Sequence, residues 1–290
     1  MAAATPAAAI RRAQHAMRRA SIRRELESVV LGKKDSLALD LEHGSADAAS
    51  IMEELTRGHG MASTPVRRLV VAFKNSGRAD AVIEMLAAKS PQQRARGARL
   101  VGALQMYEAV SWLAVLLESK DRTVVCAAAR ALGRIGGAKS ASAIVSAIHR
   151  RGLNRRLVAE LARCAPDLFI ENALGEPQRP SVRPALAMAA GLRRRHAAVG
   201  PLIGLLERGS RRERVISCRA LGWIGSGTAI PPLKAALQDR DWKIRMSAAK
   251  ALGALRAHSA RDDLKFLQID LNARVRTASR NALNRIEGRV

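Results

Sequence analysis

The histidines and cysteines are the residues of this 290-residue chain with the greatest potential for metal binding or nucleophilic chemistry. The six histidines are scattered from His15 to His258, and Cys126, Cys164 and Cys218 lie in separate apolar stretches. None of the cysteines has a His or a second Cys at metal-ligand spacing. Because a lone Cys in an apolar helix usually fills a core, we expect no metal site, no cofactor and no catalytic residue.

A glycine-rich string, GWIGSGTAI from Gly222 to Ile230, has the spacing of a phosphate-binding loop. It lacks a Lys after its last Gly, and it joins two predicted helices instead of a strand and a helix. We therefore interpret it as a turn.

The chain carries 50 Lys and Arg against 25 Asp and Glu, a formal net charge of +25. Only seven residues are aromatic, so a nucleic-acid surface would have few groups for base stacking. Arg supplies 40 of the 50 basic residues, and this Arg- and Ala-rich composition leaves open whether the charge is functional or compositional. No apolar run approaches the roughly 18 residues that cross a bilayer, and we predict a cytoplasmic location.

A short pattern of small, basic and Leu positions recurs along the chain, as in ARALGRI (129–135), CRALGWI (218–224) and AKALGAL (249–255). Taking the small residue after the Leu as a marker places markers at Gly102, Gly133, Ala162, Gly191, Gly222, Gly253 and Asn284. Their spacing is close to constant, with a period of about 31 residues, which is the length of one helix pair. We predict an all-α fold, an α-solenoid of about seven helix-turn-helix repeats over residues 63–290.

Each repeat is predicted to contain two helices. In the first, helix A, an Arg lies eight residues before the marker, at Arg94, Arg183, Arg214, Arg245 and Arg276. Pro201 and the Pro231–Pro232 pair suit the first turn of the second, helix B. Basic residues concentrate in helix A, so we expect the nearly uncharged helix B to line the concave surface and the helix A ridge to be basic.

The units DRTVVCAAARALGRIGGAKSASAIVSAI (121–148) and DWKIRMSAAKALGALRAHSARDDLKFL (241–267) resemble the bacterial HEAT-like repeats named after phycobilisome lyases. That family runs from a capping Asp through Val-Arg to an Ala-Leu-Gly helix end, and it includes chromophore lyases, iron hydroxylases and scaffolds. The resemblance therefore implies a fold and no single activity. The hydroxylases use His-Glu pairs, and no His of this chain is followed by Glu, which excludes that activity.

The resemblance also implies a ladder in which the Asp of one unit pairs with the Arg of the next. Among the residues four before each repeat Arg, only Asp241 is acidic. We therefore expect an incomplete ladder and several arginines without an acidic partner.

Residues 1–62 lie outside the clear repeats. Residues 1–24 contain six Arg and no acidic residue, and they are predicted to form a basic amphipathic helix with Ile10 and Met17 on its apolar side. Its arginines are predicted to contact a membrane or another anionic surface: Arg11, Arg12, Arg18, Arg19 and Arg23. A transit peptide and a solvated helix are the alternatives. Residues 25–62 are predicted to form an acidic, short helical cap. The Pro-rich segment 175–184 is predicted to form a hinge or a change in superhelical curvature.

We predict a non-catalytic scaffold or adaptor that binds an acidic protein partner or an assembly at the inner face of the membrane, with no small-molecule substrate. The predicted partner-binding residues are Arg193, Arg194, Arg195, Arg208, Arg211, Arg212, Arg214 and Trp242. Trp242 follows an Asp at a helix start, and we expect it to be the most exposed Trp. One alternative is a non-specific nucleic-acid-binding protein that uses the helix A ridge; the other is a phycobilin-lyase-like or other repeat-family enzyme.

Overall fold

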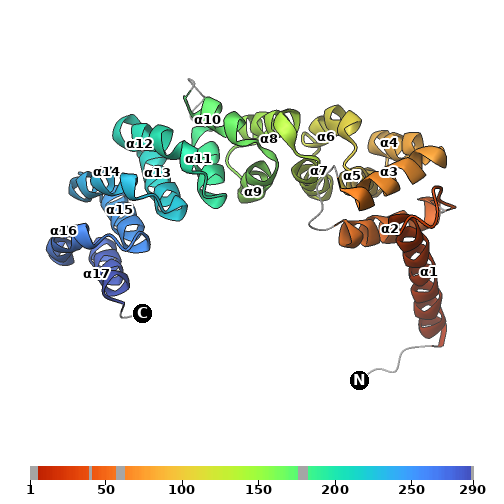
Figure 1. Cartoon of the computed structure of the whole chain (residues 1–290), viewed down its shortest axis with the longest axis horizontal. Helices are drawn as coiled ribbons and strands as arrows, with labels where there is room; N and C mark the ends of the chain where they lie inside the picture. Colours follow the sequence, from red (N-terminus) through yellow and green to blue (C-terminus); the bar gives the residue numbers. More distant parts are fainter. Residues whose placement is uncertain (1–5, 39–40, 57–62, 176–181, 289–290) are drawn as a thin grey trace. The chain divides into compact units, whose positions relative to one another are not determined.

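The structure, a computed structural model, describes residues 6–38, 41–56, 63–175 and 182–288. In these residues the regular secondary structure is entirely helical (Figure 1). The chain divides into two compact units, Met1–Ala143 and Ile144–Val290. Most of the Pro-rich segment expected to act as a hinge lies at residues 176–181, outside the described residues.

The first unit begins with two helices that precede the repeats and continues with the first helix pairs. Its helices are α1 (Pro6–Val30), α2 (Leu41–Leu55), α3 (Thr64–Asn75), α4 (Arg78–Ala87), α5 (Pro91–Ala103), α6 (Val110–Leu116) and α7 (Arg122–Ile135), followed by α8 (Gly137–Arg151), which runs across the division between the units.

The second unit continues the alternation of A and B helices. Its A helices are α9 (Arg155–Cys164), α11 (Arg183–Leu192), α13 (Arg211–Ile224), α15 (Trp242–Ala254) and α17 (Ala273–Glu287), and its B helices are α10 (Asp167–Gly175), α12 (Val199–Arg208), α14 (Ile230–Ala235) and α16 (Arg261–Phe266). Within this unit α13, α15 and α17 form one row, and α12, α14 and α16 form the other (Figure 1). The described residues from α3 to α16 form seven helix pairs, so the predicted all-α solenoid of about seven repeats is confirmed.

Several A helices are followed by a residue with a left-handed backbone conformation. This residue lies three positions after the marker. Gln105, Arg194 and Arg256 have φ angles of 51°, 51° and 49°, and Gly225 has a φ of 87°. A left-handed residue stops a helix and turns the chain away from the helix axis. Short 3₁₀ turns such as η2 (His196–Ala198), η3 (Gly227–Ala229) and η5 (His258–Ala260) then lead into the B helices.

Consecutive A helices approach each other closely because the marker position of one faces an Ala of the next. A Cβ added at Gly102, Gly191, Gly222 or Gly253 would lie 2.7, 2.8, 2.9 or 2.7 Å from the Cα of Ala131, Ala220, Ala251 or Ala282, respectively. Real Cβ atoms do not approach a backbone atom so closely. The small marker residues that define the repeat in the sequence are therefore the residues on which helix stacking depends.

The repeat arginines fix the turn that precedes their own helix. Arg245 donates from Nη1 to the carbonyl oxygens of Asp239 and Arg240, at 2.7 and 3.1 Å, and Arg276 contacts Asp270 and Leu271 in the same way. These contacts satisfy carbonyl groups in a loop that has few other donors. The arginine at this position therefore has a structural role in each of these repeats.

The expectation that the arginines lack acidic partners is wrong for much of the second unit. Arg245 binds Asp270 through two hydrogen bonds of 2.7 and 3.0 Å, and Arg214 pairs with Asp239. The ladder carboxylate lies six residues before the next repeat Arg, not four, because the residue four before is the N-cap of the helix. Arg183 pairs instead with the nearly buried Glu213, at 3.5 Å.

The N-terminal region is held together by ion pairs between α1 and α2. Arg19 contacts Asp47 and Glu54 at 3.2 and 3.1 Å, and Arg23 also contacts Glu54. α1 continues beyond residue 24, where the sequence predicted a division between segments, and Leu26 is fully buried. In the described part of the chain, no helix is both long enough and apolar enough to span a membrane.

Gly253→Ala is expected to destabilise the protein, although Ala forms helices better than Gly. The new Cβ would lie 2.8 Å from the Cβ of Ala282. Forcing α15 and α17 apart should cost about 1–3 kcal/mol, against about 1 kcal/mol gained in helix propensity. Urea denaturation followed by circular dichroism measures the net effect. Gly200→Ala in α12 is the control, because nothing lies within 4 Å of its added Cβ; equal stabilisation by both substitutions would contradict the account.

Asp270→Asn is expected to lower the free energy of unfolding at pH 7 by about 2 kcal/mol, the typical contribution of hydrogen bonds to a charged group. The side-chain hydrogen bonds from Arg245 hold the pKa of Asp270 below its usual value. Since the folded-state pKa is depressed, the stabilisation is present above the unfolded pKa of about 4 and is lost as the pH falls through the lowered pKa. Asp262→Asn, at an exposed carboxylate, should have little effect at any pH; a pH-independent loss in Asp270→Asn would contradict the ladder's electrostatic role.

Candidate functional site

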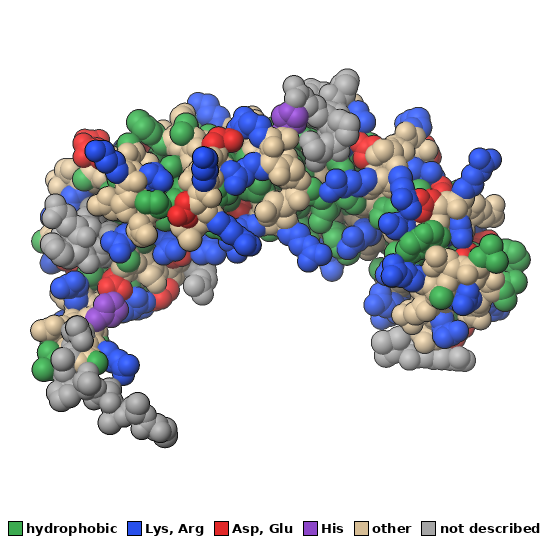
Figure 2. Space-filling view, turned by 180° about the vertical axis from the view of Figure 1, so that it is seen from behind, with side chains coloured by type: hydrophobic (Ala, Val, Ile, Leu, Met, Phe, Trp, Pro, Cys, Tyr) green, Lys and Arg blue, Asp and Glu red, His purple; other side chains and the backbone are tan. Residues whose placement is uncertain are grey.

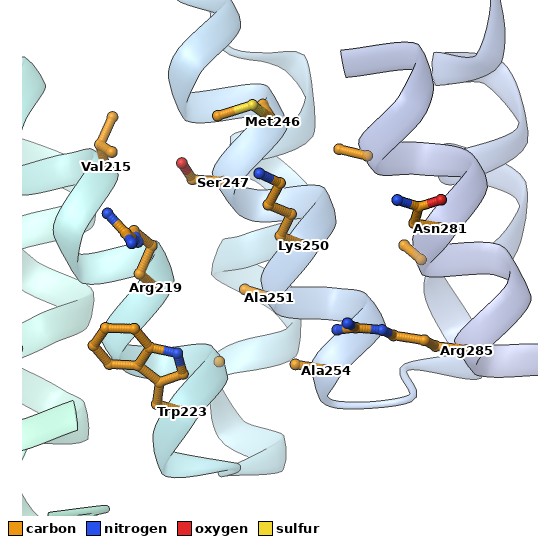
Figure 3. A pocket seen from close by; sticks show the side chains of 13 residues that line it. Val215, Arg219, Trp223, Met246, Ser247, Lys250, Ala251, Ala254, Asn281 and Arg285 are labelled. Carbon is orange, nitrogen blue, oxygen red and sulfur yellow. The ribbon is translucent and has the colours of Figure 1, made fainter. Parts of the chain in front are cut away.

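The exposed faces of α13, α15 and α17 form a groove with a volume of about 600 Å³ (Figure 3). Small residues form much of its lining, because the A helices pack through Gly and Ala. Longer side chains project from this lining, with Arg219 and Trp223 on α13, Lys250 on α15 and Arg285 on α17 (Figure 3). The lining residues are Val215, Arg219, Gly222, Trp223, Met246, Ser247, Lys250, Ala251, Ala254, Ala278, Asn281, Ala282 and Arg285.

A second hollow of about 490 Å³ shares Val215 and Arg219 with the first and extends it toward α9 and α11. Its other lining residues are Leu153, Arg155, Val158, Met188, Arg211, Arg212, Ile216 and Lys243. We call the two hollows together the basic groove. Among the residues that the structure describes, seven basic side chains line it and no Asp or Glu does: Arg155, Arg211, Arg212, Arg219, Lys243, Lys250 and Arg285.

The expectation that helix B lines an uncharged groove is therefore wrong for the second unit. The A helices line the basic groove, and their repeat-specific positions carry its charge. In the space-filling view from behind, Lys and Arg side chains cover more of the visible surface than Asp and Glu side chains do (Figure 2).

Most of the basic groove's charge has no carboxylate partner in the described part of the chain. Arg211 pairs with Asp241. In the residues that the structure describes, the other six basic side chains of the groove form no ion pair with a carboxylate. A concave surface lined by one sign of charge attracts oppositely charged ligands.

Two tryptophans lie close to cations of this region. The Arg219 guanidinium lies 5.7 Å from the Trp223 ring, and Trp242 has Lys243 and Arg274 at 5.5 and 5.4 Å. The prediction that Trp242 is the most exposed Trp is wrong: it is only partly exposed, whereas Trp112 and Trp223 are exposed. The adjacent cations explain this burial, because they cover part of the Trp242 ring.

The predicted partner-binding arginines do not all lie at the basic groove. Arg211 and Arg212 line the basic groove, whereas Arg193, Arg194 and Arg208 are exposed but do not line it.

Arg195 and Arg214 are used by the fold. Arg195 is mostly buried, pairs with Asp167 at 3.0 Å and donates to the carbonyl oxygen of Pro166 at 2.9 Å. Burial lowers the pKa of Arg195. Arg214 belongs to the ladder with Asp239.

Some of the predicted N-terminal contact arginines form ion pairs and others are exposed. Arg19 and Arg23 form the ion pairs to α2, while Arg12 and Arg18 are exposed. The side chain of Arg11 lies outside what the structure describes.

The cysteines behave as core residues where they are buried. Burial raises the pKa of the Cys164 and Cys218 thiols to about 12, so both are protonated at neutral pH. Cys126 is partly exposed. The described residues contain no cluster of three His, Cys, Asp or Glu side chains that could hold a metal ion.

Five residues of the basic groove are not among the predicted site residues: Arg155, Arg219, Lys243, Lys250 and Arg285. The positions of some of them within the repeat could have indicated the groove. Arg219 and Lys250 occupy the same position of consecutive repeats, as do Arg212, Lys243 and Arg274. Aligning the A helices on their markers would have identified these positions as one exposed face.

The match to a family model supports the repeat architecture. A family model described as HEAT repeats matches residues 79–162 and 201–284. A designed armadillo repeat protein is 17% identical, with 71% of this chain and 98% of that chain covered and a TM-score of 0.39. Human deoxyhypusine hydroxylase in complex with glycerol is 18% identical, with 95% and 99% covered and a TM-score of 0.39.

A search of curated proteins finds no significant match. The two segments that match the family model make up more than half of the chain, and they coincide with the periodic helix pairs. The chain belongs to the HEAT repeat family.

Proposed function

We propose that this protein is a non-catalytic scaffold that holds an acidic protein partner in the basic groove. The main support is the groove's lining, in which the described residues include seven basic and no acidic side chains beside small Gly and Ala residues. Such a surface draws an acidic partner by charge, and the small residues of the floor leave room for the partner's side chains.

Nucleic acid is the alternative ligand for this charge. A surface that binds single strands combines cations with several aromatic platforms. Among the described residues of the basic groove, Trp223 is the one aromatic side chain, and half-buried aliphatic side chains such as Val215 and Met246 lie among the cations. This composition favours a polypeptide.

Reversing three charges of the groove should remove the binding of an acidic polypeptide. The variant Arg212→Glu/Arg219→Glu/Lys250→Glu is expected to bind fluorescent poly-glutamate at least about tenfold more weakly than the wild type, since it replaces three attractions by repulsions. Fluorescence anisotropy at physiological ionic strength measures the affinity. Arg193→Glu/Arg240→Glu/Arg256→Glu is the matched control, because it changes the net charge equally at exposed residues outside the groove.

Equal losses in the two variants would show that only the net charge matters and would contradict a groove-specific site. The same titration with single-stranded and duplex nucleic acid tests the alternative. Binding of either that is tighter than that of poly-glutamate at the same salt concentration would overturn the proposal.

The content of bound chromophore or metal in the purified protein tests the catalytic alternatives. A purified protein that carries a chromophore or a stoichiometric metal would contradict the scaffold proposal and favour a lyase-like or other enzyme. Membership of the phycobilisome-lyase type of HEAT-like repeats stays a prediction, because the matching family model describes HEAT repeats in general.

The first half of α1 supports a second proposal, contact with an anionic membrane surface at its cytoplasmic side. Ile10 and Met17 are 59% and 64% exposed, and the Arg12 and Arg18 side chains are exposed as well. Exposed apolar and basic side chains on one helix are typical of segments that lie at a lipid interface.

Vesicle flotation tests this contact with the full chain. The wild type is expected to float with vesicles that contain anionic lipid, and Ile10→Glu/Met17→Glu to remain in the dense fraction, because Glu opposes both insertion and charge attraction. Val115→Glu/Leu168→Glu changes two other exposed apolar residues and should float like the wild type. Equal flotation of all three proteins would contradict a role for α1.

A further inference from the structure

The basic groove is organised in rows that follow the repeat. Arg212 and Lys243, which line the groove, occupy equivalent positions of α13 and α15, and Arg274, which is not among the lining residues, occupies the same position of α17. Seven residues further along each helix lie Arg219, Lys250 and Asn281. We call these the first and the second row. Seven residues are nearly two turns of a helix, so both rows lie on the same face of their helices, about 10.5 Å apart.

An apolar row lies between the two basic rows. Val215 and Met246 are three residues after the first row and four before the second, and both are partly exposed in the groove. On the same face of α17 the equivalent residue is Thr277, which is exposed. From α13 to α15 the surface therefore alternates from cation to aliphatic side chain to cation.

Two of the first-row cations, Lys243 and Arg274, lie against an aromatic ring. The Trp242 ring has Lys243 at 5.5 Å on its own helix and Arg274 at 5.4 Å on the next. A cation fixed against an aromatic ring loses less conformational freedom when it binds a ligand. Trp242 thus connects the first-row residues of α15 and α17.

The width of this pattern matches one helix of a binding partner. An α-helix with its side chains is about 10–12 Å across, so a helix lying on Val215 and Met246 could reach both rows with its flanks. An extended strand does not fit as well, because its side chains alternate between two faces. A strand that directs carboxylates to both rows has no side chains left to cover the apolar row.

The spacing of the repeats matches the periodicity of such a helix. A helices in close contact lie about 8–10 Å apart, and the Gly222–Ala251 contact brings α13 and α15 together at this point. Two turns of a ligand helix rise about 10.5 Å over seven residues. Acidic residues at positions i and i+7 would therefore meet the same row in successive repeats.

We propose that the ligand of the basic groove is an acidic amphipathic α-helix, with an apolar stripe on Val215 and Met246 and with Asp or Glu residues on both sides of the stripe against the two basic rows. This inference rests on the proposed function and specifies its partner. The recognition mode is that of a helix lying in a groove, with charges that set its orientation.

Three labelled peptides of equal length and composition, rich in Leu and Glu, test the proposal with the full chain. One has Leu in a single helical stripe flanked by Glu, one has the same residues in scrambled order, and one alternates Leu and Glu with the period of a strand. The striped peptide should bind at least about tenfold more tightly than the other two, and circular dichroism should show a gain of helix in the complex.

Val215→Thr/Met246→Gln is the diagnostic variant, because it keeps the side-chain sizes and removes the apolar row. It should abolish the preference for the striped peptide and leave the binding of poly-glutamate unchanged. Val115→Thr/Leu168→Gln, at exposed residues outside the groove, should retain the preference.

The outcomes separate this inference from the proposed function. Equal binding of the three peptides, or a preference for the alternating one, would overturn the amphipathic helix while the acidic partner stands. Failure of every acidic peptide to bind would overturn both proposals. A preference for the striped peptide that persists in Val215→Thr/Met246→Gln would place the helix elsewhere and contradict the inference.

Discussion

Consecutive A helices approach each other closely through Gly or Ala at the marker position, and this contact determines how the repeats stack. Four of the A helices, α5, α11, α13 and α15, present Gly near their end to an Ala of the next A helix, as in Gly222–Ala251 and Gly253–Ala282. With so little side-chain volume between them, the helices pack in register. The same packing gives the groove a shallow floor and lets longer side chains of one repeat line up with those of the next. The fold and the candidate site therefore have one physical cause.

The high positive charge of the chain has several separate roles. Arg214 and Arg245 hold the turns and pair with the ladder carboxylates, and Arg195 binds carbonyl groups of a neighbouring loop. Arg19 and Arg23 hold α1 against α2. The charge that remains for an anionic ligand includes the cations of the basic groove that have no carboxylate partner in the described residues. A net charge alone would not have distinguished these groups.

Much of the fold could be predicted from the sequence because the repeat period is long and regular, and the markers at Gly102, Gly191, Gly222 and Gly253 are the residues at the helix contacts. The sequence predicts the wrong register for the ladder, because Asp241 is the only acidic residue four positions before a repeat Arg. Asp241 is the N-cap of α15, and the carboxylates that pair with the repeat arginines are Asp239 and Asp270. The groove could not be located from composition, since which helix lines it depends on how successive pairs stack. The partial burial of Trp242 could not be predicted for the same reason, because Arg274, which covers part of its ring, lies one repeat away.

In the proposed function, the A helix face of the second unit binds an acidic polypeptide. Lysine acylation of the full chain, read by mass spectrometry with and without poly-glutamate, tests it most directly, because Lys243 and Lys250 line the groove whereas Lys89 and Lys265 are exposed elsewhere. The account predicts that poly-glutamate lowers the reactivity of Lys243 and Lys250 several-fold and leaves Lys89 and Lys265 unchanged. Uniform protection of all four lysines, or protection of Lys89 and Lys265 alone, would contradict it.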